Sequence, residues 1–161
     1  MLTLFTLLGP KMYHGQYSIS GGFNISSTRL HMDITDAYNE LLFAAKCPDG
    51  TPGCADWDTF RPEDAFLIRK FIREECGFRG PEDPIHSQSI YLTRKLLERL
   101  FKKYGVRPIT IRQYQGDIVL IPAYCAHQVR FRLHISSLQL IHGKRLPIAR
   151  IVSRLLVISC L

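Results

Sequence analysis

Two apolar runs early in the chain predict a pair of β-strands. Residues 28–34 and 37–45 are rich in apolar positions, and a short polar turn around Thr35 and Asp36 separates them. The next stretch, CPDGTPGCADWD at residues 47–58, combines prolines, glycines and aspartates, which indicates an irregular loop. We therefore expect strand, turn, strand and loop in this part of the chain.

Helical periodicity appears in the middle of the sequence. Residues 62–75, PEDAFLIRKFIREE, begin with a proline and two acids and then carry apolar residues at helical spacing. Residues 92–105, LTRKLLERLFKKYG, place leucines and aromatics on one stripe, and Gly105 supplies a C-terminal stop. Two helices are therefore predicted after the early strands.

Strand signals return in ITIRQYQ, residues 109–115, and in DIVLIPA, residues 117–123, which Gly116 joins. Strands, then helices, then strands again indicate a mainly β fold with inserted helices. The last segment, PIARIVSRLLVISCL at residues 147–161, has apolar residues at helical spacing, so a basic amphipathic helix is one interpretation. A terminus that packs against nothing is the other.

Length and composition favour one domain. The chain has 161 residues, 46% of them hydrophobic, which is enough to bury a core. Its five cysteines are scattered and form no CxxC pair, so we expect reduced thiols in an intracellular protein and no zinc ribbon. It has no long apolar run and no secretory start, and we expect a soluble protein without membrane contact.

The net charge of +7 is concentrated at the end of the chain. Residues 1–129 hold 15 basic and 14 acidic side chains, whereas residues 130–161 hold six basic ones and no acid. The basic character therefore belongs to the tail, and it suggests a weak DNA contact by residues 130–161.

Two candidate metal ligands interrupt the first strand. Alternate residues of a strand point to the same face, so His31 and Asp33 can reach one ion while Met32 faces away. By itself an HxD triplet is a weak signal, because many strands contain one by chance. A glycine turn, an alternating strand and a proline corner in residues 115–129 lead to His127, which could return beside that strand. Two histidines and a carboxylate are the facial triad of non-haem Fe(II) oxygenases; a structural histidine is the alternative.

Five segments extend this pattern into a family resemblance. They are GPKMY (9–13), STRLHMDITDAYN (27–39), CADWDTFRPEDAFLIRKFIRE (54–74), DPIHSQSIYLT (83–93) and GDIVLIPAYCAHQV (116–129). In this order the chain resembles the JmjC domain of the hairless-like branch of histone lysine demethylases over about residues 8–129.

The resemblance implies a fold and a reaction. The fold would be a cupin-like double-stranded β-helix, or jelly roll, incomplete at both ends. The ligands of Fe(II), and hence the catalytic residues, would be His31, Asp33 and His127, with 2-oxoglutarate as cosubstrate. The expected reaction is demethylation of methyl-lysine on histone H3, at lysine 9, through hydroxylation of the N-methyl group and release of formaldehyde. The partner would be chromatin and the location the nucleus.

The resemblance also points to residues around the ion. Thr28 and Asn39 would bind 2-oxoglutarate, although each could equally be an ordinary polar residue of a half-buried strand. Tyr13 would line the methyl-lysine pocket through cation–π attraction, or be a core tyrosine. Relatives often add a lysine near this point, but Lys46 fits better as a solvated residue at a strand end.

The resemblance stops after residue 129. We therefore divide the chain into a partial JmjC domain, residues 1–129, and a divergent basic tail, residues 130–161. A jelly roll that lacks a closing strand exposes an unpaired edge, and residues 130–141 are apolar enough to supply a replacement. Two alternatives to the demethylase are a catalytically inactive module that binds chromatin or protein, and a hydroxylase of another protein or small molecule.

Overall fold

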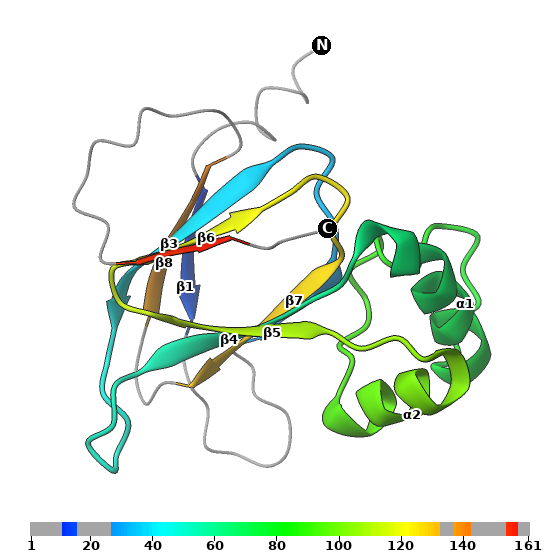
Figure 1. Ribbon diagram of the computed structural model, residues 1–161, viewed down its shortest axis with the longest axis horizontal. Helices are drawn as coiled ribbons and strands as arrows, with labels where there is room; N and C mark the ends of the chain where they lie inside the picture. The colour runs from blue at the N-terminus through cyan, green and yellow to red at the C-terminus, as the bar shows by residue number, and fades with distance from the viewer. Residues whose placement is uncertain (1–10, 16–26, 133–136, 143–153, 158–161) are drawn as a thin grey trace.

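The computed structural model describes residues 11–15, 27–132, 137–142 and 154–157, with the backbone alone for residues 11–15, 27 and those after 131. Two β-sheets face each other (Figure 1). In spatial order, the larger contains β1 (Lys11–Gly15), β8 (Ser137–His142), β3 (Ala37–Ala44), β6 (Asp117–Ile121) and β9 (Arg154–Val157). The smaller contains β2 (Ser27–His31), β7 (His127–Arg132), β4 (Cys54–Thr59) and β5 (Ile109–Tyr114).

All neighbouring strands are antiparallel except β6 and β9, which run parallel. Strands that are distant in sequence pair directly, as β2 does with β7 and β3 with β8. This is the predicted jelly roll. The predicted strands at 28–34, 37–45, 109–115 and 117–123 are confirmed as β2, β3, β5 and β6.

One hydrophobic cluster fills the space between the sheets. It joins inward-facing residues of β3 and β6 to those of β4 and β7, with Trp57 as its largest member. The other buried members are Ala37, Leu41, Ala55, Val119, Ile121, Cys125, Val129 and Phe131. Burial alternates along β3 and β6, as expected for strands with one face toward a core.

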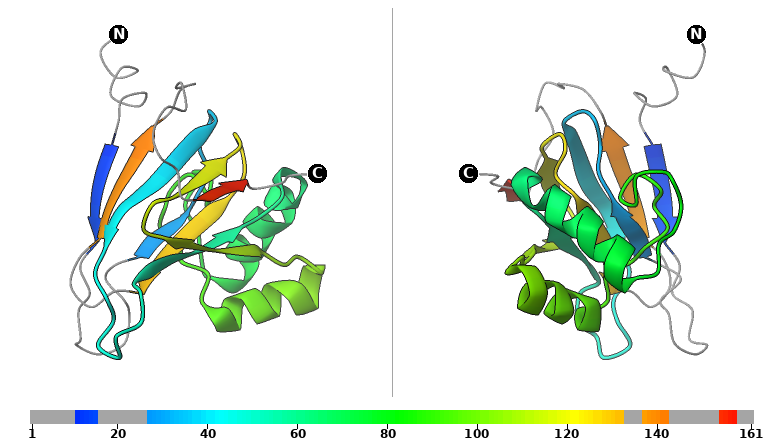
Figure 2. Two further views of the ribbon diagram at one scale, coloured as in Figure 1. Left: turned by 60° about the vertical axis from the view of Figure 1, so that its left-hand side comes forward. Right: turned by 90° about the vertical axis from the view of Figure 1, so that its right-hand side faces the viewer.

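Two helices cover the outer face of the smaller sheet (Figures 1 and 2). A 3₁₀ turn at Pro62–Asp64 leads into α1 (Ala65–Glu75), and α2 (Arg94–Tyr104) comes next. Thr93 Oγ accepts from the Leu96 N–H at the start of α2, and Gly105 ends it with a φ of 71°. Both predicted helices are therefore confirmed.

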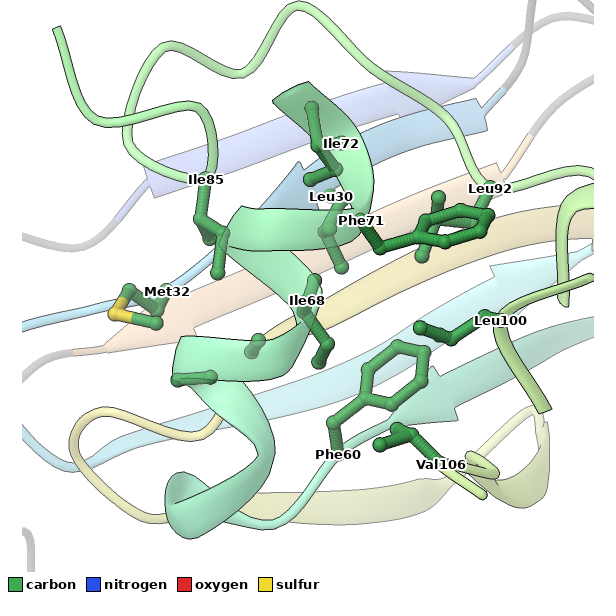
Figure 3. Close-up of a cluster of buried hydrophobic side chains, with 12 residues drawn as sticks. Leu30, Met32, Phe60, Ile68, Phe71, Ile72, Ile85, Leu92, Leu100 and Val106 are labelled. Carbon is green, nitrogen blue, oxygen red and sulfur yellow. The ribbon is translucent and has the colours of Figure 1, made fainter. Parts of the chain in front are cut away.

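A second hydrophobic cluster joins these helices to the sheet (Figure 3). Leu30 and Met32 contribute to it from the β2 segment, so the residue between them, His31, points to the opposite side, between the sheets. The remaining buried members are Phe60, Ala65, Ile68, Phe71, Ile72, Ile85, Leu92, Leu100, Val106 and Ala126. The helices thus pack against β2, the strand that carries the candidate ligand His31.

The prediction of a loop at residues 47–58 is wrong in its second half, because β4 begins at Cys54. Asp56 and Asp58 disfavour a strand on local grounds, but neighbouring strands satisfy both carboxylates. Asp56 accepts from Arg112 of β5 and Arg130 of β7 at 2.9 and 3.1 Å. These long-range partners are invisible in a short window of sequence.

The tail contributes strands. β8 starts within the predicted replacement segment and lies between β1 and β3, so the tail does supply a strand to the larger sheet. The predicted tail helix is wrong at residues 154–157, which form β9 beside β6; the rest of that segment lies outside the described residues. Pairing with the β6 edge prevails here over helical periodicity. Among the described residues, no helix has the length and apolar character needed to cross a membrane.

Candidate metal centre

Three potential metal ligands meet between the sheets. His31 is the last residue of β2 and His127 the first of β7, and the two are directly opposite each other in the antiparallel ladder. Asp33 lies just beyond the end of β2. One ligand atom from each of the three side chains lies within 4.8 Å of the other two. The convergence predicted from the HxD motif and the distant histidine is therefore present.

A β-bulge sets the orientation of the β2 side chains. Thr28 is opposite Val129 and His31 is opposite His127, so β2 has one more residue than β7 between these two pairs. In a regular strand, positions three apart face opposite sides, but the extra residue returns His31 to the face of Thr28. Because Val129 belongs to the inner cluster, both β2 residues lie on the interior side.

Both imidazoles are held with the same nitrogen toward the backbone. The Nδ1 atom of His31 lies 2.9 Å from the carbonyl oxygen of Arg29, and that of His127 lies 2.9 Å from the carbonyl oxygen of Cys125. A carbonyl can only accept, so Nδ1 carries the proton and donates in each ring. The Nε2 lone pair of each histidine therefore remains for a metal ion, and the backbone bond fixes its direction.

The surroundings of His127 favour its neutral form. Burial lowers the pKa of His127 to about 4, and the neighbouring His31 acts in the same direction. The hydrogen bond to the Cys125 carbonyl and the charge of Asp33 oppose this shift without cancelling it. A neutral imidazole is the form that binds a metal ion, so this ligand is ready at neutral pH.

Asp33 supplies the carboxylate at the more open side of the group. Its Oδ2 atom is 4.0 Å from Nε2 of His127, and its side chain is 40% exposed, against 3% for His127. The Asp33 backbone is tied to the loop before β7, because its carbonyl oxygen accepts from the Tyr124 N–H at 2.8 Å. Tyr124 has a φ of 63°, a conformation that is unfavourable for tyrosine. The loop therefore holds the third ligand beside the other two.

The donor set fits the metal that the sequence predicts. Two imidazole nitrogens and one carboxylate oxygen are the ligands of a facial triad, which leaves positions on the ion for other molecules. A purely structural pair of histidines needs no carboxylate beside it, whereas an oxygen of Asp33 lies within 4.8 Å of a nitrogen of each imidazole.

The two predicted cosubstrate residues differ in environment. Thr28 lies on the face of His31 and is partly buried. Asn39 is completely buried on β3, and its side-chain oxygen accepts from Gln113 Nε2 at 3.2 Å. Asn39 thus has a hydrogen bond, as expected of an ordinary buried polar residue, and this bond joins the larger sheet to β5 of the smaller one. Binding of 2-oxoglutarate by either residue stays a prediction.

For Tyr13 the structure gives a strand register, and for Lys46 it gives the exposure of the side chain. Tyr13 lies on β1 opposite Gln139 of β8, which is in turn opposite Leu41 of β3. Since residues in one cross-strand row share a face, Tyr13 holds a register position on the side of the buried Leu41. Its assignment to a substrate pocket stays a prediction. Lys46 is exposed, as expected.

Sequence reasoning missed two interior residues near the centre. Trp57 stacks on His127 with ring centroids 5.7 Å apart and planes inclined by 27°, and its Nε1–H donates to Gln113 Oε1 at 2.9 Å. Trp57 was hidden by the prediction of a loop at 47–58. The alternation of ITIRQYQ could have placed Gln113 on an inward face, but nothing local pairs it with a tryptophan so far away in sequence.

Most of the chain matches a known protein family. The family model described as "JmjC domain, hydroxylase" matches residues 19–132. Lysine-specific demethylase 3 of Drosophila melanogaster is 37% identical in a match that covers 76% of this chain and 18% of that protein. Human lysine-specific demethylase 3A is 35% identical in a match that covers 76% of this chain and 12% of that protein.

A mouse relative, the probable JmjC domain-containing histone demethylation protein 2C, is 29% identical in a match that covers 76% of this chain and 7% of that protein. The chain therefore spans less than a fifth of the length of these curated relatives. The family model, in contrast, covers most of the chain and includes all three residues of the His31, Asp33 and His127 group. The chain belongs to the JmjC domain family of hydroxylases.

Proposed function

We propose that the chain is an Fe(II)- and 2-oxoglutarate-dependent oxygenase that demethylates methyl-lysine on histone H3. The observation that carries this proposal is the convergence of His31, Asp33 and His127 inside a JmjC jelly roll. The names of the relatives, which include lysine-specific demethylases and a histone demethylation protein, support the substrate class. Lysine 9 of histone H3 as the target and the nucleus as the location belong to the same proposal.

Iron and 2-oxoglutarate, when bound, would supply the oxidising chemistry that removes a methyl group as formaldehyde. The protein's own contribution is positioning. His31 and His127 would present Nε2 to the ion because their Nδ1 atoms are held by backbone carbonyls. Asp33 would add a negative charge on the more exposed side, where a substrate can approach.

The interior around the group would orient the cosubstrate. Thr28 offers a hydroxyl on the face of His31, and Asn39 an amide on the opposing sheet, so both are suited to hydrogen-bond a carboxylate of 2-oxoglutarate. Tyr13, from its row on β1, would form an aromatic wall for the methylammonium group.

The decisive experiment measures succinate and formaldehyde from 2-oxoglutarate with Fe(II), with and without a histone H3 peptide dimethylated at lysine 9. We expect the methylated peptide to stimulate both products, and Asp33→Ala to abolish both. An unmethylated peptide is the matched substrate control. A folded chain that binds iron but forms no succinate with any peptide would contradict the proposal.

One observation favours the alternative of a catalytically inactive interaction module. None of the lysine or arginine side chains that the structure describes is buried, so none of those is enclosed with the metal group to pair with the far carboxylate of 2-oxoglutarate. In this alternative the basic tail, residues 130–161, would contact DNA phosphates. Arg130 is already paired with Asp56, which leaves later basic residues for that role. Salt-dependent DNA binding that weakens in Lys144→Gln/Arg145→Gln, without succinate formation, would select this module.

A further inference from the structure

We propose that Trp57 is a positioning residue for the metal centre, and that Gln113 fixes its orientation. This inference rests on the proposed function, since it concerns how one ligand of the proposed iron is held. It goes beyond that function because it assigns roles to two residues that neither bind the ion nor touch the substrate.

The strand register brings Trp57 to His127. In the ladder between β4 and β7, Thr59 is opposite His127 and Trp57 is opposite Val129, so Trp57 is the diagonal neighbour of the histidine on the inner face. The ring centroids are 5.7 Å apart and the planes are inclined by only 27°, which is an offset stack. Trp57 is 1% exposed, so the indole is enclosed by other residues of the interior.

His127 is thereby held by two independent contacts. The Cys125 carbonyl accepts from Nδ1 at 2.9 Å and limits rotation of the ring within its plane. The indole face limits tilting of the same ring out of that plane. Together these contacts leave Nε2 one direction, toward the side of His31 and Asp33.

The indole is itself fixed by a buried amide. Gln113 is fully buried and its Nε2 faces three acceptors, namely the Asn39 carbonyl at 2.9 Å, the Asp117 carbonyl at 3.0 Å and Asn39 Oδ1 at 3.2 Å. The amide can therefore present only Oε1 to the indole, and Trp57 Nε1–H donates to it at 2.9 Å. A flipped amide would bring oxygen atoms together on one side and two donors on the other.

A buried series of polar side chains like this one is energetically costly unless every group is hydrogen-bonded, because buried amides and N–H groups lose their hydration. A leucine or phenylalanine at position 57 could contribute to the hydrophobic cluster without needing a partner for an indole N–H. The hydrogen bonds, unlike hydrophobic packing alone, also fix the orientation of the indole. It connects His127 through Trp57 and Gln113 to Asn39, the predicted cosubstrate residue on the opposite sheet.

The test is calorimetric titration of the full chain with Co²⁺, which is stable in air and accepts imidazole and carboxylate ligands. Four variants are compared with the unchanged chain: Trp57→Leu, Trp57→Phe, Gln113→Leu and Phe131→Leu. Phe131 is the matched control, because it is a buried aromatic residue of the same cluster and lies on the strand of His127. Urea unfolding of each variant measures its stability separately from its Co²⁺ affinity.

We expect Trp57→Leu to weaken Co²⁺ binding by about 10- to 100-fold, the range typical for residues that orient a metal ligand. Trp57→Phe, which keeps an aromatic face, and Phe131→Leu should each stay within about threefold. Gln113→Leu should weaken binding by about tenfold, and it decides the question if Trp57→Leu does not fold.

Folded Trp57→Leu and Gln113→Leu proteins that bind Co²⁺ as tightly as the unchanged chain would overturn this inference and leave the proposed function intact. An equal loss in Phe131→Leu would also overturn it, by showing that general packing sets the affinity. If the unchanged chain bound no Co²⁺ at all, the proposed metal centre would fail and this inference with it.

Discussion

Acidification should destabilise the metal-free protein through His127. The folded-state pKa of His127 is about 4, below the ordinary 6.5. Between these values the unfolded chain takes up a proton that the folded chain excludes, so stability is present above pH 6.5 and is lost as the pH falls toward 4. A shift of this size corresponds to about 3 kcal/mol in full, of which about 2 kcal/mol is lost between pH 7 and pH 5.

The assay is urea unfolding with a chelator present, monitored by the fluorescence of Trp57, which is the single tryptophan of the chain. His127→Gln is the control, because glutamine hydrogen-bonds without titrating. Carboxylates titrate in both proteins, so their effect cancels in the difference. We expect the unchanged chain to lose about 2 kcal/mol more than the variant between pH 7 and pH 5. Equal losses in the two proteins would refute the reasoning about burial.

Three further substitutions test other parts of the structure. Asp56→Ala removes the common partner of Arg112 and Arg130, and because these arginines are 48% and 41% exposed and stay solvated, the free energy of unfolding should fall by only about 2 kcal/mol. A decrease below about 0.5 kcal/mol in chemical unfolding would contradict the stabilising role of these two ion pairs. Gly105→Ala places a side chain at a φ of 71° with no atom within 4 Å of the new Cβ, so backbone strain alone should lower the free energy of unfolding by about 1 kcal/mol. An unchanged unfolding midpoint would contradict this and show that the end of α2 relaxes. Thr28→Val keeps the shape of the side chain and removes its hydroxyl, so the KM for 2-oxoglutarate should rise about tenfold at constant thermal stability. An equal KM in the variant and the unchanged chain would remove Thr28 from the proposed cosubstrate site.

Hydrophobic periodicity in the sequence was sufficient to predict most of the strands and helices, because β3, β6 and the two helices each bury one regular face. It failed where long-range partners determine the structure. β4 contains two aspartates whose carboxylates accept hydrogen bonds from its neighbouring strands, and β9 forms where residues with helical spacing meet the β6 edge. Neither set of contacts can be seen in a window of consecutive residues.

The ligands were predictable for a different reason. His31 and Asp33 are a local pattern, and a returning strand in a jelly roll explains how a distant histidine reaches them. The β-bulge was not predictable, although it is what puts Thr28 on the face of His31. Nor was the support of His127 by Trp57, since it depends on the register between β4 and β7.

The central claim is that His31, Asp33 and His127 together bind one ferrous ion. Its most direct test is anaerobic Fe(II) loading of the unchanged chain and of three single alanine variants at these positions, with X-ray absorption to identify the ligands. We predict one iron per chain with two imidazole ligands, and a clear loss of iron in each folded variant. Iron held equally well by the His127→Ala protein, or by ligands that include no imidazole, would contradict the claim.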